Sequence, residues 1–388
     1  MRVLILVSVH DKPYGGHYHT TLAYFNALRN SFRDTKLLVI GNENPHWITN
    51  LGIQAEFVRY NGLNLVSAYK KVAKSAEDYE ILHAFDEFAY FFIRSIVEKK
   101  VICTRCGGPN PEKRYFPKVS NLVCLSRENK IFFERSSKIE NCILLPNRVP
   151  PFEINLELCA NARANYDIDS SKLVLLRISR IDAYYLKSIE QTITLGKELS
   201  KIGGEIEVII LGAVYDKKLF DELNSRYSHV KFISDEKYTK DAKRVLGLAD
   251  IVVGTGRSLM EAALKGKVMF APVKNRDTPE LMTKENIKHF LNTNFSERTI
   301  VNTSRETSLE YLKTLVEELS VLKDYKVWIT DYAKKTFLLE SCPEKLEQFY
   351  KNASVEKCSF DFYRQMIRVT SVFLRFSLRK WFESSSHN

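Results

Sequence analysis

The amino-acid sequence predicts an α/β fold with two doubly wound parallel sheets, each in its own domain, and a helical extension at the C-terminus. Two observations support this prediction. Apolar runs of strand length alternate with helical segments twice along the 388 residues, and a polar interruption separates the two series. Continuous apolar runs are typical of parallel strands that helices cover on both faces. The length also favours two or three domains.

The first series occupies residues 1–150, the expected N-terminal domain. Its strands and helices alternate as they do in βαβ units. The expected helices include His19–Phe32, Leu65–Ala76, Ala89–Lys99 and Glu128–Ser136. The expected strands are Arg2–Val9, Lys36–Gly41, Ala55–Tyr60, Glu80–Phe85, Val101–Arg105, Asn121–Leu125 and Cys142–Pro146.

The second domain is expected over residues 172–335, after a hinge at residues 151–171 where prolines and polar residues break the pattern. Right-handed crossovers place the loops that follow parallel strands on one edge of each sheet. We expect these edges of the two domains to face each other across a cleft. The predicted strands are Leu173–Ser179, Glu205–Leu211, Val230–Ile233, Ile251–Val253 and Val268–Pro272, and the predicted helices are Ser188–Ile202, Lys217–Tyr227, Lys240–Leu248 and Ser258–Leu264.

The C-terminal residues 336–388 are expected to be helical, and their last part is basic. Residues 356–382 carry six basic and two acidic side chains among many aromatic ones. On a helix, Arg364, Arg368, Arg375 and Arg379 fall on one stripe. Such a helix suits an anionic membrane interface. The alternative is a terminal helix that packs on the N-terminal domain with its arginines in water.

Composition narrows the classes of partner and compartment. The formal charge of +11 favours anionic partners such as nucleotide diphosphates, nucleic acid or acidic lipid. Seven scattered cysteines do not form a disulfide framework, so we expect reduced thiols in a cytoplasmic protein. The initial apolar run reads as a strand rather than a signal peptide, and no apolar run is long enough to span a membrane.

Several candidate residues follow predicted strands, where ligands bind in open α/β sheets. Gly15 and Gly16 lie between the first strand and its helix, where their amides can approach a phosphate or a sugar. Arg180 follows the first strand of the second domain, and Lys187 comes seven residues later. Both cations suit a leaving diphosphate. The alternatives are a plain turn and surface charges.

The segment Gly254–Glu261 joins a strand to a helix in the second domain. Gly256, Arg257 and Ser258 suit donor contacts, and the Glu261 carboxylate suits ribose hydroxyls. The alternative is structural, because Ser258 followed three residues later by Glu261 matches a capping box. Arg257 has the same two interpretations, a phosphate contact or a surface charge.

His83 ends a predicted strand, where its ring could contact substrate hydroxyls or act in acid–base chemistry. A buried core histidine is the alternative. Asp167 and Asp169 match a metal-binding D-x-D pattern, but they precede a strand rather than follow one. We interpret them as turn residues and predict no metal and no cofactor. The G-x-G-x-x-G dinucleotide fingerprint is absent.

Together these residues resemble the retaining glycosyltransferases of the GT-B fold, specifically family 4, up to about residue 350. The glycine pair, the strand-end His83 and the Arg180 clamp resemble family motifs. The helix beginning Glu261-Ala262-Ala263 is similar to the family's E-A-M-A segment. Ser126 and Asn147, the latter in a Pro-Asn-Arg-Val run, look like the family's acceptor-side or cleft positions.

Three positions depart from the family pattern. Tyr185 stands where the clamp lysine usually follows the arginine, so Lys187 is its expected substitute. Phe85 replaces the second histidine of the strand-end motif. Val253 replaces the first of two glutamates, which in relatives contacts donor-sugar hydroxyls. This last departure leaves the identity of the sugar open.

The resemblance implies two Rossmann-like domains and a retaining transfer of a sugar from a nucleotide-sugar donor to a glycan or lipid-linked acceptor. In that mechanism Arg180 and Lys187 hold the diphosphate, Glu261 holds the ribose, and the leaving phosphate takes the acceptor proton. The expected setting is cell-surface polysaccharide synthesis at the cytoplasmic membrane face, with residues 356–388 on the membrane. Two alternatives stay open: a catalytically silent GT-B protein that binds glycan or nucleotide, and a nucleotide-sugar epimerase-like enzyme. Nucleic-acid binding is not expected, because no recognition module is found.

Overall fold

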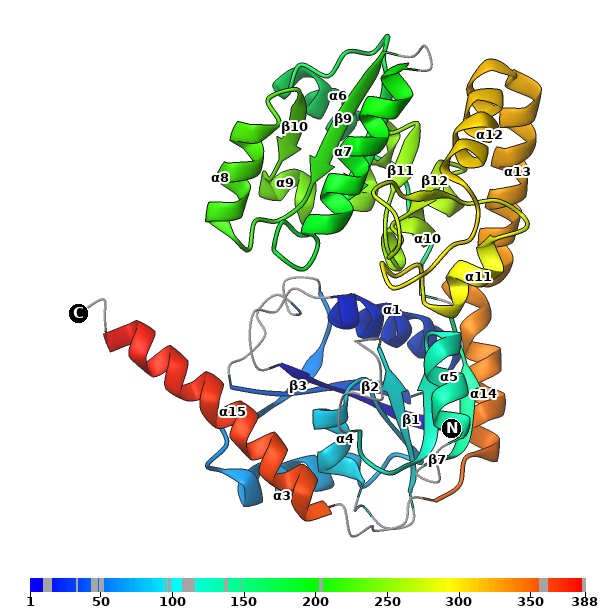
Figure 1. Ribbon diagram of the computed structural model, residues 1–388. Helices are drawn as coiled ribbons and strands as arrows, with labels where there is room; N and C mark the ends of the chain where they lie inside the picture. The colour runs from blue at the N-terminus through cyan, green and yellow to red at the C-terminus, as the bar shows by residue number, and fades with distance from the viewer. Residues whose placement is uncertain are drawn as a thin grey trace. The chain divides into compact units, whose positions relative to one another are not determined.

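The computed structural model (Figure 1) describes residues 1–9, 16–32, 34–42, 48, 52–94, 96, 99–106, 116–135, 139–146, 148–201, 205–355 and 362–385. It divides into two compact units, each considered by itself. Unit 1 joins Met1–Arg148 to Leu339–Asn388, and unit 2 is Val149–Leu338. The C-terminal residues, predicted as a separate helical extension, are therefore grouped with unit 1.

Unit 1 is built on a parallel sheet of seven described strands in the order β3-β2-β1-β4-β5-β6-β7. Each predicted strand is found within a few residues of its expected bounds. The strands are β1 Arg2–Val9, β2 Asp34–Gly41, β3 Ala55–Arg59, β4 Ile81–Ala84, β5 Lys100–Arg105, β6 Val119–Cys124 and β7 Ile139–Leu144. The described helices of this unit are α1 Gly16–Ser31, α3 Leu65–Ala76, α4 Glu87–Ile93, α5 Arg127–Glu134, η3 Leu339–Ser341, α14 Cys342–Asn352 and α15 Phe362–Ser385.

The alternation of side chains along β1 builds a core on each face of this sheet. Val3, Ile5 and Val7 belong to a buried cluster with side chains of α1 and α14. Leu4 and Leu6 belong to a second cluster with side chains of α3, α4 and α15. Both faces of the central strand are therefore apolar, which explains its continuous hydrophobic sequence.

Helix α4 begins two residues earlier than the sequence suggested, because Asp86 caps its N-terminus, and it ends six residues earlier than expected. The Asp86 carboxylate accepts hydrogen bonds from the amides of Phe88 and Ala89, at 2.9 and 2.7 Å. It also accepts from the amide and hydroxyl of Ser8, at 2.7 and 2.8 Å. Asp86 thus ties the end of β1 to the start of α4.

Unit 2 has a six-stranded sheet in the order β10-β9-β8-β11-β12-β13, with the short β13 antiparallel to β12. Its five parallel strands match the predicted ones, while β13 was not predicted. The strands are β8 Leu173–Ile178, β9 Ile206–Leu211, β10 Val230–Ile233, β11 Ile251–Val253, β12 Val268–Ala271 and β13 Glu280–Leu281. The helices are α6 Leu156–Asn165, α7 Leu186–Lys201, α8 Lys217–Arg226, α9 Glu236–Thr239, η2 Ala242–Leu248, α10 Arg257–Leu264, α11 Ile287–Asn292, α12 Arg305–Glu317 and α13 Leu319–Thr336.

The segment expected as a hinge, residues 151–171, contains α6. The Asn155 side chain caps this helix by accepting from the Leu158 amide at 2.8 Å. Cys159, Ala162 and Ile168 are buried in the same core as the strands of unit 2. The segment is therefore part of the unit 2 core, because its apolar side chains pack there despite its polar composition.

Helix α15 packs on unit 1 through one face, the arrangement that the sequence left as an alternative. Gln365, Val369 and Phe373 are buried, and the Ser377 hydroxyl donates to the Asn61 carbonyl at 3.1 Å. The opposite face exposes Tyr363, Ile367, Leu378, Trp381 and Phe382. Within the described residues, no helix combines the length and apolar character needed to span a membrane.

Candidate functional site

The sheet of unit 2 has a topological switch point between β8 and β11. Strand β9 pairs with one side of β8, and β11 pairs with the other. The connections that leave the carboxyl ends of β8 and β11 therefore diverge, and ligands of open α/β sheets bind in the crevice that this leaves. The residues after β8 and after β11 form the candidate site.

Arg180 lies just after β8, where its guanidinium remains available to a ligand. Its side chain is 46% exposed and forms an ion pair with Asp182 at 3.6 Å. The guanidinium also lies over the rings of Tyr185 and Tyr215, at 5.3 and 5.2 Å from their centroids. These rings limit the orientations of Arg180 while leaving its charge at the edge of the sheet.

Lys187, predicted to share the diphosphate with Arg180, has a different partner. It lies in the first turn of α7, and its ammonium donates to the Lys274 carbonyl at 2.5 Å. This bond ties α7 to the loop after β12. Because an ammonium group has three donors, a phosphate contact by Lys187 would have to be made alongside this bond.

The N-terminus of α10 follows β11 and begins at a glycine with a positive φ. Gly256 is the N-cap residue with a φ of 54°, a conformation that favours glycine over other residues. The Ser258 hydroxyl accepts from the Thr255 amide at 3.2 Å and donates to the Thr255 carbonyl at 3.1 Å. Because Ser258 lies inside the helix rather than at its N-cap, the capping-box interpretation of Ser258 and Glu261 is wrong.

Glu261 is instead paired with Arg257 one turn earlier on the same helix. Arg257 Nε donates to Glu261 Oε1 at 2.7 Å, and both side chains are largely buried. Arg257 Nη1 is also buried, without a hydrogen-bond partner among the described residues. The pair thus holds a guanidinium with one uncommitted nitrogen at the start of α10, where the helix dipole also favours an anion.

Arg177 is a second buried arginine at this edge, and sequence reasoning missed it. It lies in β8 and is fully buried. It donates to the Ser188 hydroxyl at 2.8 Å and to the Ile178 carbonyl at 3.1 Å, and it lies 3.8 Å from the Glu297 carboxylate. Burial lowers the pKa of Arg177 to about 10. The available signal was a single arginine within the apolar strand Leu173–Ile178.

His83 lies in the interior of unit 1 rather than at an accessible strand end. Its ring nitrogens lie 2.7 Å from the Tyr350 hydroxyl and 2.6 Å from the Thr104 hydroxyl. Burial lowers the pKa of His83 to about 3, so the ring is neutral at physiological pH. This is the environment of a core histidine, the alternative that the sequence left open.

The other predicted residues of unit 1 have structural positions or lie outside the described residues. Gly16 is the first residue of α1. The Ser126 hydroxyl caps α5 by accepting from the Asn129 amide at 3.4 Å. Gly15 and Asn147 lie outside the described residues. The described residues contain no cluster of three or more side chains suited to a metal ion.

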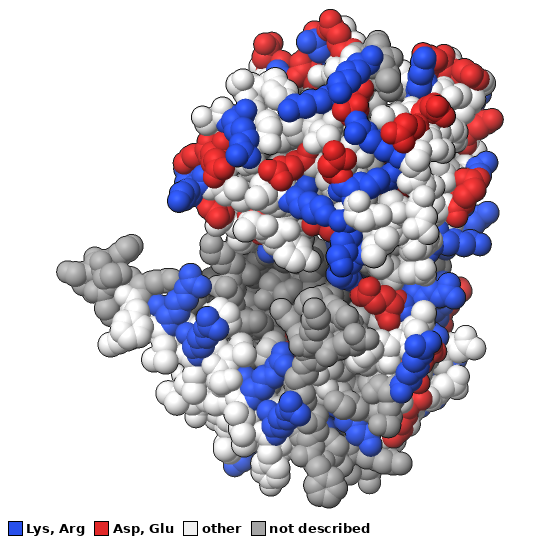
Figure 2. Space-filling model, viewed as in Figure 1, with Lys and Arg blue, Asp and Glu red and all other residues white. Residues whose placement is uncertain are grey.

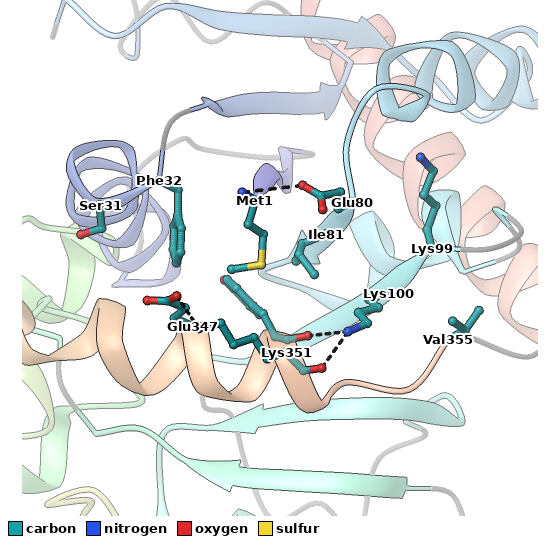
Figure 3. A pocket seen from close by; sticks show the side chains of 11 residues that line it. Met1, Ser31, Phe32, Glu80, Ile81, Lys99, Lys100, Glu347, Lys351 and Val355 are labelled. Carbon is teal, nitrogen blue, oxygen red and sulfur yellow. Dashed lines mark hydrogen bonds and ion pairs between the residues drawn. The ribbon is translucent and has the colours of Figure 1, made fainter.

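A pocket of about 730 Å³ lies at the edge of the unit 1 sheet where the strands begin (Figure 3). Its lysines already have partners. Lys100 donates to the carbonyls of Tyr350 and Lys351, at 3.1 and 2.8 Å, and Lys351 pairs with Glu347 at 2.8 Å. These contacts hold the end of α14 against the sheet, so we interpret the pocket as a packing groove.

Comparison with known proteins gives the fold a precedent. No protein-family model matches the sequence, and no curated protein matches it. Solved structures do match. HepE of Anabaena, crystallised with UDP, has a TM-score of 0.64 at 16% identity, over 91% of this chain and 100% of that one. A glycosyltransferase of Rickettsia africae has a TM-score of 0.63 at 13% identity, over 90% of this chain and 98% of that one.

The UDP-GlcNAc 2-epimerase of Neisseria meningitidis, crystallised with UDP-GlcNAc, has a TM-score of 0.50 at 11% identity, over 91% of this chain and 100% of that one. At these identities the likeness concerns the fold. The fold class predicted from the sequence is confirmed, and the chain has the two-domain GT-B architecture of these glycosyltransferase structures.

Proposed function

We propose that this protein is a glycosyltransferase that moves a sugar from a nucleotide-diphosphate sugar to a glycan or lipid-linked acceptor, with retention of anomeric configuration. The observation that carries the proposal is the pair of arginines at the switch point of unit 2. Arg180 is exposed there, and Arg257 keeps a buried nitrogen without a partner among the described residues. HepE, which shares the fold, was crystallised with UDP-glucose.

The two arginines suit the leaving group of such a reaction. When the bond between sugar and phosphate breaks, negative charge grows on the nucleoside diphosphate, and cations placed beforehand stabilise that charge. Glu261 fixes the Arg257 guanidinium through the 2.7 Å hydrogen bond, and in this proposal it also accepts from a ribose hydroxyl. Gly256 has no side chain, so the backbone at the start of α10 can approach the diphosphate closely.

The acceptor proton passes to the leaving phosphate in this proposal, so the reaction needs no protein base. This agrees with the buried, neutral His83. We assign no metal or cofactor to the reaction, because the arginines provide the positive charge.

Binding of nucleotides to the full-length protein tests this proposal. We expect one of UDP, GDP, CMP and dTDP to raise the midpoint temperature of thermal unfolding. A ligand at about 100 times its dissociation constant stabilises the folded protein by about 2.7 kcal/mol. Arg257→Ala and Glu261→Ala should each reduce the shift. The matched control is Arg226→Ala on α8, whose arginine pairs with Glu190 and Glu222, and it should keep the shift. Absence of any shift in the wild-type protein would contradict the proposal.

The epimerase-like alternative is supported by the likeness to the UDP-GlcNAc 2-epimerase. An epimerase converts the nucleotide-sugar without an acceptor, whereas a transferase releases nucleotide only when the acceptor is present. The silent alternative is motivated by Val253, which stands where relatives carry a glutamate. A silent protein would bind nucleotide and turn over no pair of donor and acceptor. Product analysis with and without acceptor distinguishes the three cases.

We also propose that α15 holds the protein on the anionic cytoplasmic face of the membrane, in cell-surface polysaccharide synthesis. Trp381 and Phe382 are each more than 60% exposed, and Arg375 and Arg379 on the same helix are exposed too. Figure 2 shows basic side chains along this helix. Exposed aromatic side chains beside arginines are typical of interfacial helices.

Sedimentation with anionic liposomes tests the membrane proposal. The double variant Trp381→Ser/Phe382→Ser should bind much less than wild type, while Leu156→Ser in unit 2, a residue that is 77% exposed, should bind like wild type. Deletion of residues 356–388 should also release the protein, but it removes the buried face of α15, so the double variant is the cleaner comparison. Equal binding by the double variant and wild type would overturn this part of the proposal.

A further inference from the structure

Arg177 is a buried cation whose neighbours come from three separate segments. It lies in β8, in register with Val253 of β11. Its guanidinium donates to the Val253 carbonyl at 3.4 Å and to the Ser188 hydroxyl of α7 at 2.8 Å. The third neighbour is Glu297, whose carboxylate lies 3.8 Å away. Because the ends of β8 and β11 meet at Arg177, Glu297 lies at the switch point.

The loop that carries Glu297 has a fixed and strained backbone. Asn294 and Phe295 have positive φ values of 58° and 54°, which is unusual for residues other than glycine. The buried Phe295 ring and a 2.8 Å hydrogen bond from its amide to the Phe290 carbonyl anchor the loop. Asn294 lies next to Gly256, where a Cβ atom would be 3.2 Å from Asn294 Nδ2. The loop therefore lies against the N-terminus of α10.

The Glu297 carboxylate is only partly used by the protein. Its side chain is 19% exposed, and Arg177 lies too far for a hydrogen bond. Glu297 Oε1 is buried without a hydrogen-bond partner among the described residues. Arg177 Nε likewise has none. A carboxylate oxygen without a donor is a costly arrangement that a hydroxyl-bearing ligand would relieve.

The charges around Glu297 indicate which part of a ligand it meets. The guanidinium groups of Arg177 and Arg180 lie 5.8 and 5.3 Å from the centroid of the same ring, that of Tyr185, and the Glu297 carboxylate lies 3.8 Å from Arg177. The carboxylate thus shares its surroundings with the arginine proposed to hold the diphosphate. A carboxylate repels phosphate but accepts hydrogen bonds from hydroxyls. In a nucleotide-sugar, the hydroxyl-bearing groups next to the diphosphate are the ribose and the transferred sugar.

We propose that Glu297 is a specificity-determining residue that accepts hydrogen bonds from hydroxyls of the transferred sugar, and that Arg177 positions it. The proposal rests on the proposed function and assigns the sugar end of the donor to the 293–299 loop. Glu261 is already bonded to Arg257 on α10, and the proposed function matches it with the ribose. Glu297 belongs to none of the sequence motifs, and only the folding of the chain brings it close to the site.

Calorimetric binding of free UDP, UDP-glucose and UDP-GlcNAc to the full-length protein tests this assignment. Wild type should bind one of the two UDP-sugars more tightly than UDP. Glu297→Gln should weaken that UDP-sugar about tenfold while leaving the affinity for UDP unchanged, because the loss of one charged hydrogen bond is worth about that factor. The matched control is Glu310→Gln on the exposed side of α12, which should change neither affinity. Arg177→Lys should also lower the ratio of the affinity for the UDP-sugar to the affinity for UDP, but by less than Glu297→Gln does.

The outcomes separate this assignment from the proposed function. If Glu297→Gln weakens UDP and UDP-sugar equally, or changes neither, the assignment is overturned and the proposed function stands. If wild type binds UDP but no UDP-sugar more tightly, the assignment is also overturned. If wild type binds none of UDP, GDP, CMP and dTDP, the proposed function fails and the role of Glu297 falls with it.

Discussion

The surroundings of His83 show that the end of a strand is not always accessible to a ligand. His83 was selected because it ends a strand of the first domain, but its imidazole bridges Tyr350 and Thr104 in the interior. Tyr350 belongs to α14, so the histidine connects the central sheet to a helix that is 267 residues away in the sequence. A strand-end position predicts accessibility only when no later segment covers the strand.

The depressed pKa of His83 makes a prediction about stability and pH. The pKa is lowered from 6.5 to about 3 by burial, so the unfolded chain binds a proton that the folded chain does not bind. The stabilisation is therefore present above pH 6.5 and is lost as the pH falls toward 3. We expect His83 alone to reduce the free energy of unfolding by about 1 kcal/mol between pH 7 and pH 5.5. Urea unfolding at several pH values measures it.

The control is His83→Gln, which has no titrating ring. It should be less stable at pH 7, by about 1–3 kcal/mol, because the Tyr350 and Thr104 hydroxyls lose well-placed partners. Its stability should change less than that of wild type between pH 7 and pH 5.5. Equal pH dependence in both proteins would mean that His83 titrates normally in the folded chain.

At the scale of elements, the sequence predicts the strands well and the termini of helices less well. Strands β1 and β8 are mostly apolar runs, interrupted in β8 by Arg177 alone, so the local pattern was sufficient to predict them. The start of α10 depended on the positive φ of Gly256, and the start of α4 depended on the cap at Asp86. The packing of α15 depended on burial of Gln365, which a hydrophobic pattern does not reveal.

The residues of the candidate site likewise divide into those that the sequence predicts and those that only the fold brings together. Arg180 follows one predicted strand, and Arg257 and Glu261 lie on the helix that follows another, so their common edge could be predicted from the topology rules. The partners Arg257 and Glu261 are one helical turn apart, yet their pairing was not anticipated. Arg177 and Glu297 are 120 residues apart by their numbering, so only the folded chain brings them together.

The docking of α15 on unit 1 predicts a difference between two glycines. Gly62 has a φ of 93°, and a Cβ atom there would lie 2.6 Å from Leu374 Cγ and 2.9 Å from its backbone nitrogen. Gly52 has a φ of 69°, and no atom of the described residues lies within 4 Å of such a Cβ. Both Gly→Ala variants carry backbone strain of about 1 kcal/mol. Gly62→Ala should lose about 1–3 kcal/mol more, because it pushes α15 away from its site.

Chemical denaturation of the two glycine variants measures this difference directly. Proteolysis gives a second readout, since a displaced α15 should be cleaved faster in Gly62→Ala than in Gly52→Ala. If the two variants lose the same stability, the contact between Gly62 and α15 does not hold the helix in place.

For the whole molecule, the path of the chain makes the two units unequal. Unit 2 is one continuous segment, Val149–Leu338, whereas unit 1 needs both ends of the chain. The α14 residues Leu346 and Tyr350 are buried in the same cluster as Val3 and Ile5 of β1. The chain enters and leaves unit 2 at neighbouring points, because Val149 and Leu338 form a parallel bridge.

This connectivity predicts which parts of the chain fold alone. Residues 149–338 contain a complete core, so we expect this fragment to unfold cooperatively and to keep the nucleotide-induced shift of the full-length protein. Residues 1–148 alone lack α14 and α15 and leave both faces of their sheet partly uncovered. That fragment should aggregate or stay unfolded, because its exposed apolar surface exceeds what a soluble domain tolerates.

Joining residues 1–148 to 339–388 through a short Gly-Ser linker should restore folding, because the ends of unit 2 lie side by side and the linker need span only that gap. Circular dichroism during thermal unfolding compares the three fragments. Cooperative unfolding of residues 1–148 by themselves would mean that α14 and α15 add to a finished domain. Cooperative unfolding only after the fusion would mean that the last fifty residues complete the first core, and that unit 1 acquires its native structure only after the whole chain has been synthesised.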